Sequence, residues 1–359
     1  MTAPRHLYVH VPFCGHRCGY CDFVTVTGNE RLHGRYVDAL LAELAPAQVE
    51  PDTVFVGGGT PSLLNDELLA RLLAGLPPVR ELTIECNPET ITPAKAQVLV
   101  EGGVNRVSLG AQSFRPRLLG VLDRRAAPAS VRAAVSTLRR AGVQNLNLDL
   151  MFGVPGQTAD DLRRDVEDAL VLEPEHISYY ELEAKPGTRF AHSHGAELAR
   201  QAEAMEDYYE LVVDTLRDAG FRWYETANFC RPGHLSEHNL GYWLGHDYLG
   251  IGIGAVSTLG LERRRNLPSL PRYLEAVETG RRPAADVELL TAGERALERL
   301  MLGLRLDRPL PLNGDRPLLD PAAVERLSRD GMIVDDGEAL QLSERGRFLA
   351  DEVVASILR

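Results

Sequence analysis

Short apolar runs alternate with longer amphipathic segments through the first two thirds of the chain. The runs have the length of strands and the segments between them the length of helices, which is typical of parallel βαβ units. The predicted strands are 7–11, 53–59, 81–86, 104–110, 145–155 and 176–183. The predicted helices are 30–45, 65–75, 93–102, 115–141, 158–172 and 198–219. Six such units suit an open barrel, although periodicity alone also allows a doubly wound sheet.

The pattern changes from about residue 285 onward. Residues 289–306 form an amphipathic helix pattern, and a proline-rich break follows at 308–321. Beyond it a helix, a turn at Gly331, a strand-turn-strand and a last helix predict a small winged-helix-like unit. Such units often bind DNA, but its wing contains the acidic run 335–338, which favours a lid or a partner surface instead. We therefore divide the chain into a barrel over 1–225, a connecting segment over 226–284 that completes the core, and a C-terminal domain over 285–359.

Composition narrows the class of protein. The chain has 359 residues, of which 44% are hydrophobic, enough for a sizeable core, and its net charge of -12 argues against nucleic acid as the main partner. The N-terminus lacks a secretory pattern, and no apolar run approaches the ~20 residues that span a bilayer. We expect a cytoplasmic, reducing location, where clustered thiols indicate metal binding rather than disulfides.

Three cysteines lie within eight residues, as Cys14, Cys18 and Cys21 of a CxxxCxxC motif. Three thiolates on one short loop can ligate three irons of a [4Fe-4S] cluster and leave the fourth iron open for chemistry. Electron-transfer clusters and structural zinc sites use four ligands, so a zinc site completed by His10 or His16 is the weaker interpretation. The isolated Cys86 and Cys230 are more typical of small buried hydrophobes.

Polar and glycine residues recur where the predicted strands end. A glycine run at 57–59 follows the second strand, Glu85 and Gln112 end the third and fourth, and Asp149 lies on the fifth. Active sites of parallel barrels gather at the carboxyl ends of the strands, and glycine lets a backbone approach a ligand closely. Each residue also has a structural interpretation, as a tight turn or a hydrogen bond within the fold.

The cysteine spacing, together with Tyr20 and the run 8–11, resembles the radical S-adenosylmethionine (SAM) superfamily. The resemblance implies an α/β fold, the radical SAM partial (β/α)6 TIM-like barrel, here with the small C-terminal winged-helix-like domain. It also implies that Cys14, Cys18 and Cys21 ligate the cluster. In that family the open iron chelates SAM, and one-electron reduction yields a 5′-deoxyadenosyl radical. The cofactor carries the difficult chemistry while the protein positions it.

A closer resemblance, to oxygen-independent coproporphyrinogen III oxidases and their relatives, covers nearly the whole chain. It rests on YVHVPFCGHRCGYCDF, GGGTPS at 57–62, IECNPE at 84–89, GAQSF at 110–114, LDLMFGVPGQT at 148–158 and YLGIGIGAVS at 248–257. The SAM contacts that it implies are Tyr8, Tyr20, Gly58, Gly59, Thr60, Glu85, Gln112, Arg124 and Asp149, with Val256 as a further candidate. From the residues alone, Arg124 is equally well interpreted as a carboxylate-binding fork or as a structural residue, either hydrogen-bonded within the fold or a surface charge.

Two departures point to one branch of that family. The oxidases continue the cluster motif as CxxxCxxCxC, whereas Phe23 occupies the last position here. Residues 238–243 read HNLGYW and match the HNxxYW signature of the haem chaperones, which the oxidases lack. The match implies haem contacts from His238, Tyr242 and Trp243, since imidazole is a common axial ligand and aromatic rings offer flat apolar surface. The structural alternative is a hydrogen-bonded histidine beside two core aromatics.

Other haem-ligand candidates are Cys230, His234 and His246, which no motif supports. Relatives of the chaperones typically carry histidines where this chain has Val256 and Ala126, so any role of those histidines does not transfer.

Two functions follow from the resemblance. The first is a haem chaperone that binds haem and hands it to acceptor haemoproteins, with a [4Fe-4S] cluster and SAM retained and any contact with membrane haemoproteins peripheral. The second is an enzyme that decarboxylates two propionate groups of coproporphyrinogen III to give protoporphyrinogen IX. Both imply an electron donor of the flavodoxin or ferredoxin type. Phe23 and the HNxxYW segment favour the first function, and whether the chain is an enzyme stays open.

Overall fold

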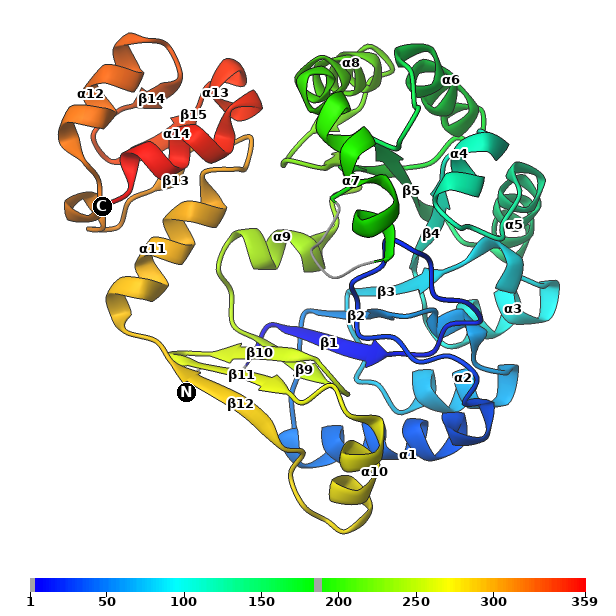
Figure 1. Ribbon diagram of the computed structural model, residues 1–359. Helices are drawn as coiled ribbons and strands as arrows, with labels where there is room; N and C mark the ends of the chain where they lie inside the picture. Colours follow the sequence, from blue (N-terminus) through cyan, green and yellow to red (C-terminus); the bar gives the residue numbers. More distant parts are fainter. Residues whose placement is uncertain (1–3, 184–188) are drawn as a thin grey trace.

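The fold is built on one large mixed sheet, seen in a computed structural model that describes residues 4–183 and 189–359 (Figure 1). Six parallel strands form its centre: β1 (His6–Val11), β2 (Thr53–Gly58), β3 (Glu81–Cys86), β4 (Arg106–Gln112), β5 (Asn145–Phe152) and β6 (His176–Glu181). In the described residues the sheet has the order β12-β11-β10-β9-β1-β2-β3-β4-β5-β6-β8-β7. The sequence-predicted strands and the parallel arrangement are confirmed.

Helices cover one face of these strands and leave the other face concave (Figure 1). The main covering helices are α1 (His33–Leu44), α2 (Asp66–Ala74), α3 (Pro93–Glu101), α5 (Pro128–Ala141), α6 (Ala159–Leu170) and α8 (Met205–Asp218). Shorter segments are α4 (Pro116–Val121), α7 (Arg189–Gln201), η1 (Glu30–Leu32), η2 (Ala45–Ala47), η3 (Pro61–Leu63), η4 (Pro88–Thr90) and η5 (Ala202–Ala204). A doubly wound sheet would carry helices on both faces, so the structure decides for the open barrel.

The strands alternate apolar and polar residues because their two faces meet different surroundings. On β4, Val107 and Leu109 pack toward the helices in the main core, whereas Arg106, Ser108 and Gln112 line a cavity on the concave side. The same alternation recurs on β5 and β6. The apolar core therefore lies between sheet and helices, and the polar positions point into the barrel.

The single helix predicted over 115–141 is wrong: α4 ends at Val121 and α5 begins at Pro128. Asp123 takes a left-handed conformation with φ 56°, which breaks the helical hydrogen-bond pattern. Pro128 then starts α5 at a position where its missing N–H costs nothing. The break brings Arg124 to the cavity wall. The helix predicted over 198–219 is likewise split, into α7, η5 and α8.

The elements from β7 to β12, which include the predicted connecting segment over 226–284, extend the sheet at both edges. They are β7 (Arg222–Trp223), β8 (Asn228–Cys230), α9 (Glu237–Trp243), β9 (Tyr248–Ile251), β10 (Val256–Leu259), β11 (Glu262–Asn266), α10 (Leu270–Glu278) and β12 (Ala285–Leu289). Strand β8 pairs antiparallel with β6, and β9 pairs parallel with β1. Helix α9 lies on the concave side between these two edges (Figure 1).

The C-terminal elements form a small unit with its own apolar core. They are α11 (Ala292–Gly303), β13 (Leu310–Pro311), η6 (Arg316–Leu318), α12 (Pro321–Arg329), β14 (Ile333–Asp335), β15 (Ala339–Leu342), α13 (Glu344–Phe348) and α14 (Ala350–Ile357). The predicted helix, strand-turn-strand and final helix are confirmed, and the three strands pair antiparallel. The guanidinium of Arg347 lies 3.6 Å from the ring centroid of Trp223 and joins this unit to β7. The division of the chain at 225 and 284 stays a prediction.

Across the described residues, none of the helices has both the length and the apolar character that crossing a membrane requires.

Candidate functional site

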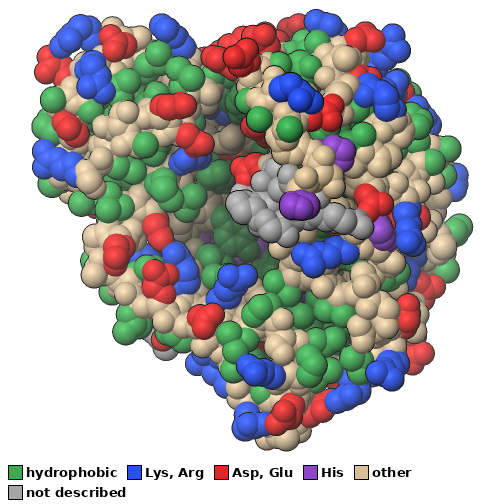
Figure 2. Space-filling view, in the orientation of Figure 1, with side chains coloured by type: hydrophobic (Ala, Val, Ile, Leu, Met, Phe, Trp, Pro, Cys, Tyr) green, Lys and Arg blue, Asp and Glu red, His purple; other side chains and the backbone are tan. Residues whose placement is uncertain are grey.

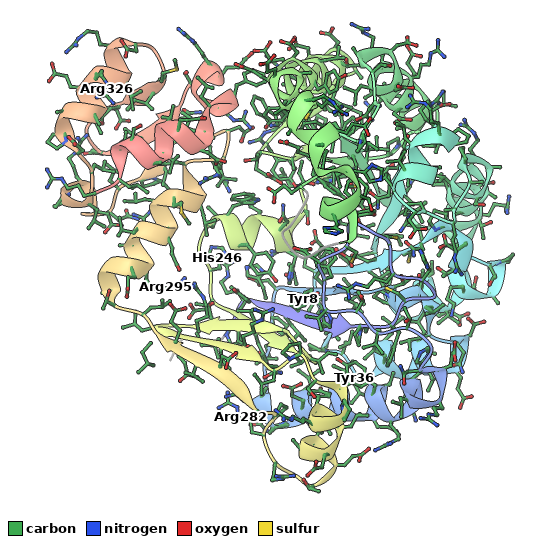
Figure 3. All side chains as sticks on the ribbon, in the orientation of Figure 1. Tyr8, Tyr36, His246, Arg282, Arg295 and Arg326 are labelled. Atoms are coloured by element: carbon green, nitrogen blue, oxygen red, sulfur yellow. The ribbon has the colours of Figure 1, made fainter. Side chains whose placement is uncertain are left out.

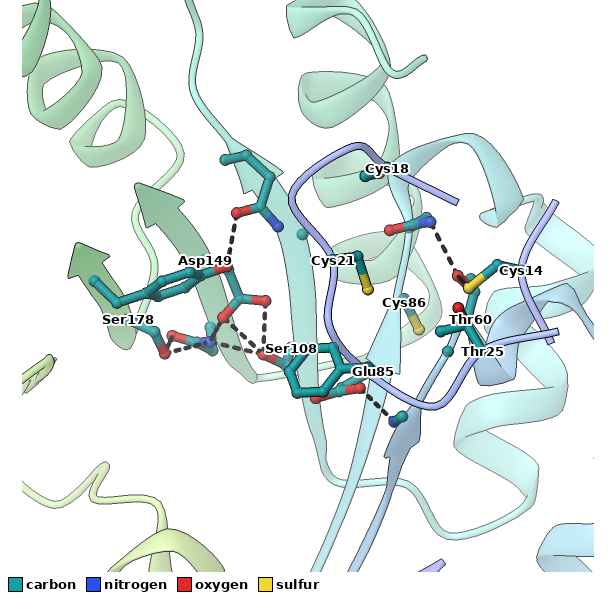
Figure 4. A pocket seen from close by; sticks show the side chains of 18 of the residues that line it. Cys14, Cys18, Cys21, Thr25, Thr60, Glu85, Cys86, Ser108, Asp149 and Ser178 are labelled. Carbon is teal, nitrogen blue, oxygen red and sulfur yellow. Dashed lines mark hydrogen bonds between the residues drawn. The ribbon is translucent and has the colours of Figure 1, made fainter. Parts of the chain in front are cut away.

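A cavity of about 340 Å³ opens at the carboxyl ends of the central strands. The cysteine loop forms one side of it, and inward-facing residues of β3 to β6 form the other (Figure 4). The predicted residues that line it are Cys14, Cys18, Cys21, Tyr20, Gly58, Gly59, Thr60, Glu85, Gln112, Arg124 and Asp149. Residues more than 130 positions apart in the chain therefore meet around one space.

The cysteine loop is pinned at its base by backbone hydrogen bonds. The N–H of Cys14 donates to the carbonyl of Val26 at 3.0 Å, and the N–H of Val26 donates to the carbonyl of Pro12 at 2.8 Å. The three cavity cysteines are free thiols and partly exposed. Burial raises the pKa of the Cys14 thiol to about 11, so binding of iron there would displace a proton. The loop thus presents three sulfur ligands to the cavity.

These donors fit an iron–sulfur cluster better than zinc. Both ring nitrogens of His10 are engaged, Nδ1 by the Tyr8 hydroxyl at 3.0 Å and Nε2 by the Val24 carbonyl at 2.8 Å. His16 Nε2 lies 3.0 Å from Asp123. Among residues 4–183 and 189–359, no three His, Cys, Asp or Glu side chains form a preassembled metal site. The loop would have to close around the irons, and its three thiols are the donor set that such clusters use.

The glycine run after β2 is required because neighbouring groups lie too close to its backbone for a side chain to fit. Gly58 has φ 111°, and its N–H donates to Glu85 Oε2 at 2.9 Å. A Cβ at Gly57 would lie 2.6 Å from the Phe55 ring, and one at Gly59 would lie 2.6 Å from the Pro12 carbonyl. No larger residue fits either place. Desolvation raises the pKa of Glu85 to about 7, because burial disfavours the charged carboxylate.

Arg124 brings a positive charge to the cluster side of the cavity. Its Nη2 donates to the Gly110 carbonyl at 2.7 Å and to Asn87 Oδ1 at 3.0 Å, while Nη1 lies 3.8 Å from Cys18 Sγ. The buried Nε has no hydrogen-bond partner among the described residues. Arg124 thus lies on the cavity wall with hydrogen bonds to the fold, and its guanidinium can still bind an anionic ligand.

Asp149 sits deeper, in a hydrogen-bond network (Figure 4). Ser108 Oγ donates to its carboxylate at 3.1 Å, and Asn147 Nδ2 donates at 2.7 Å. Burial raises the pKa of Asp149, and the neighbouring donors oppose that rise. Gln112 has φ 67°, and its Oε1 accepts from the Tyr180 hydroxyl at 2.8 Å.

Several cavity residues were missed by sequence reasoning: Arg106, Ser108, Asn147, Ser178 and Tyr180 carry no motif, and Asn239 lies within the HNxxYW segment without having been assigned a role. On three strands the signal was present as polar residues at every second position, in RVSLGAQ, NLNLDL and HISYYE. Two predicted SAM contacts do not lie on this cavity wall. Tyr8 bonds to His10, and Val256 pairs with Arg265 of β11.

Helix α9 carries the HNxxYW segment and is fixed by its N-terminus. Glu81 of β3 accepts from the backbone N–H groups of Glu237 at 2.9 Å and His238 at 3.0 Å. Ser236 caps the helix by accepting from the N–H of Asn239. A carboxylate at a helix N-terminus is favourable because the exposed N–H groups carry partial positive charge.

His238 is enclosed and fully hydrogen-bonded. It is 1% exposed, its Nδ1 lies 2.8 Å from Thr53 Oγ1, and its Nε2 lies 2.9 Å from the Tyr242 hydroxyl. Thr53 Oγ1 also contacts His6 Nδ1 at 2.8 Å, and His6 Nε2 contacts His246 Nδ1 at 3.0 Å. Burial lowers the pKa of His238 to about 3. The structure thus places His238 in a chain of hydrogen bonds.

The other candidate haem-binding residues differ in burial and lie on different elements. Tyr242 and Trp243 are half-buried at the end of α9, Cys230 is buried on β8, and His234 is half-buried before α9. His246, labelled in Figure 3, pairs with His6. A hollow with hydrophobic side chains at its floor lies on the face where Figure 1 draws α9 (Figure 2). The structure does not bring all these candidates to one point.

Comparison with known proteins gives matches along the whole chain. The Radical SAM superfamily profile matches residues 8–169, and the HemN C-terminal domain profile matches residues 290–349. Haem chaperone HemW of Mycobacterium tuberculosis is 40% identical, covering 99% of this chain and 95% of that protein. Haem chaperone HemW of Escherichia coli is 33% identical, covering 99% and 98% respectively.

A solved structure supports the fold. Coproporphyrinogen III oxidase HemN of Escherichia coli, described as a radical SAM enzyme, matches with a TM-score of 0.85 and 24% identity, covering 99% of this chain and 90% of that one. The predicted fold class, a radical SAM barrel with a small C-terminal domain, is confirmed. With relatives of 30–40% identity over nearly its full length, the chain belongs to the HemW family of radical SAM proteins.

Proposed function

We propose that this protein is a haem chaperone, which binds haem and transfers it to acceptor haemoproteins. The observation that carries the proposal is the position of α9. This helix bears the HNxxYW segment and contributes Ser236 and Asn239 to the wall of the cavity that the three cysteines also line. The full-length relatives named haem chaperones support the same function.

The cofactor part of the proposal assigns Cys14, Cys18 and Cys21 to a [4Fe-4S] cluster and the remaining predicted cavity residues to SAM. Bound together, cluster and SAM supply one-electron chemistry. The chain's own contribution is positional: Gly58 and Gly59 allow close backbone approach, and Arg124 supplies a cation that the described carboxylates leave unpaired. A flavodoxin- or ferredoxin-type electron donor and a cytoplasmic location belong to the same proposal.

The haem part of the proposal keeps His238, Tyr242 and Trp243 as contacts. Both ring nitrogens of His238 already have partners, so ligation of iron by Nε2 requires the Tyr242 hydroxyl to move away. Tyr242 and Trp243 are half-buried, so part of each residue is accessible to an apolar ring without breaking the ring-nitrogen bonds of His238. The proposal therefore has two independent parts: the aromatic residues contact the haem ring, and His238 ligates the iron.

A second candidate function is coproporphyrinogen III oxidation. The observation that favours it is the set of predicted SAM contacts gathered around one cavity. One observation argues against oxidation. The oxidases have a cysteine at the last position of CxxxCxxCxC, whereas this chain has Phe23, which is 64% exposed and lines the cavity. The fold similarity to HemN does not separate the two functions.

A haem titration tests the proposal. The reconstituted protein should give a Soret shift with haem. Trp243→Ala should weaken haem binding about tenfold or more, because an apolar contact is lost. If His238 ligates the iron, His238→Ala should change the haem spectrum. An unchanged spectrum and affinity in His238→Ala would remove it as a ligand. Parallel assays with SAM and coproporphyrinogen III should yield no protoporphyrinogen above a Cys18→Ala control, and product above that control would establish the oxidase function.

A further inference from the structure

The deep end of the cavity contains an arginine whose guanidinium forms no ion pair among the described residues. Arg106 of β4 is 2% exposed and lines the cavity, its buried Nε has no hydrogen-bond partner, and its guanidinium forms no ion pair in the part of the chain that the structure describes, although its charge acts on the buried carboxyl of Asp149. Buried guanidinium groups are normally paired, since leaving one without partners in a protein interior is costly. The guanidinium of Arg106 therefore has hydrogen-bond donors that are available to a bound ligand.

The strand register explains why Arg106 faces the cavity. It pairs with Thr83 of β3 and Asn145 of β5, in the same inward alternation as Ser108 two residues further on. The predicted cluster ligands lie beyond the opposite, carboxyl ends of the strands. The Arg106 end of the cavity is thus separate from the cluster loop.

The surroundings of Arg106 favour a singly charged anion. Asp149 lines the same cavity, and Glu225 is buried beside Asn239, with Glu225 Oε1 accepting from Asn239 Nδ2 at 3.1 Å. These carboxyl groups would repel a doubly charged phosphate. A carboxylate matches the planar fork of a guanidinium, and its single negative charge balances the single positive charge of Arg106.

Helix α9 links this end of the cavity to the HNxxYW segment. Ser236 and Asn239 line the cavity with Arg106, while Tyr242 and Trp243 lie on the same seven-residue helix. A ligand with a flat body against those two aromatic residues would therefore lie beside the helix that also borders the Arg106 end of the cavity, with a carboxylate-bearing side chain directed toward the arginine.

We propose that Arg106 is the binding residue for a carboxylate side chain of the tetrapyrrole, a propionate arm inserted into the deep end of the cavity. This inference rests on the proposed haem function and adds a specificity determinant to it. The propionate supplies the charged partner that Arg106 lacks, and the apolar ring stays at α9.

The test compares haem with its dimethyl ester, in which both propionates are neutral. Wild-type protein should bind haem about tenfold or more tightly than the ester, as expected for a charge-assisted pair. Arg106→Met should lower haem affinity to that of the ester and leave ester affinity unchanged, and Arg106→Lys should fall between. Arg139→Met, which removes a half-buried arginine of α5 outside the cavity, should keep the wild-type preference.

The outcomes separate the inference from the function on which it rests. Equal binding of haem and ester by wild-type protein would overturn the role of Arg106 and leave the haem function standing. No Soret shift at all would overturn the haem function and this inference with it. Weaker SAM binding in Arg106→Met, with haem affinity unchanged, would also overturn the inference. The comparison of the two ligands on wild-type protein holds even if Arg106→Met fails to fold.

Discussion

The cysteine loop and helix α9 flank the same cavity, but they present their functional residues in opposite ways. The three thiols of the loop are partly exposed and are not in disulfides. His238 of α9 is 1% exposed, with both ring nitrogens already bonded. Both regions are recognisable from short motifs, yet only the loop leaves its ligand atoms available. A motif identifies a residue type, and its surroundings decide whether that residue can react without a rearrangement.

The largest effect should come from the loop. Cys18→Ala removes one of three cluster ligands, so anaerobic reconstitution should leave almost none of the about four irons per chain that a [4Fe-4S] cluster contains. Iron and sulfide analysis with the visible absorption near 400 nm measures this. Cys230→Ala, a buried cysteine on β8, is the matched control and should keep its cluster. A full cluster in Cys18→Ala would refute the assignment and with it the contrast between loop and helix.

A smaller effect should come from the anchor of α9. Glu81→Ala removes the acceptor for two helix N–H groups, which should destabilise the docking of α9 by about 2–6 kcal/mol, since each unsatisfied buried donor costs about 1–3 kcal/mol. Hydrogen exchange of the α9 amides measures it. Glu81→Gln keeps one side-chain acceptor and should fall between.

Glu278→Ala breaks a solvent-exposed pair with Arg35 and is the control variant, so it should leave the exchange of the α9 amides at the wild-type rate. Equal protection of α9 in Glu81→Ala and wild type would mean that other contacts hold the helix.

The smallest of these effects concerns pH. Burial holds the pKa of His238 at about 3, below the unfolded value of about 6.5, so the unfolded chain binds the proton more readily. The stability associated with neutral His238 is complete above pH 6.5 and is lost as the pH falls toward 3. Between pH 7 and pH 5 the loss should be about 2 kcal/mol.

Urea unfolding of wild type and His238→Gln at both pH values measures this difference. The comparison is needed because Glu85 acts with the opposite sign: its pKa is raised to about 7, so its stabilising effect is lost as the pH rises through 7. The same pH dependence in both proteins would show that His238 is not enclosed as the structure places it.

Sequence reasoning was most successful where a local pattern has a single structural meaning. The six strands followed from apolar runs, and the C-terminal strand-turn-strand followed from its turn residues. It failed at 115–141, because the left-handed Asp123 between α4 and α5 leaves no mark in helical periodicity. It also missed Ser108 and Asn147, whose alternation on the strands looked like ordinary half-exposed positions.

The sequence by itself determined the α/β class, the three-thiol loop, the glycine run and the relation to radical SAM proteins, because each depends on residue types at short spacing. Only the tertiary structure decided that the helices cover one face, that Arg124 turns inward and that the buried Nε of Arg106 has no hydrogen-bond partner among the described residues. It also decided that His238 is sealed by Thr53 and Tyr242. Burial and hydrogen-bond partners depend on segments far apart in the chain, so no local pattern can specify them.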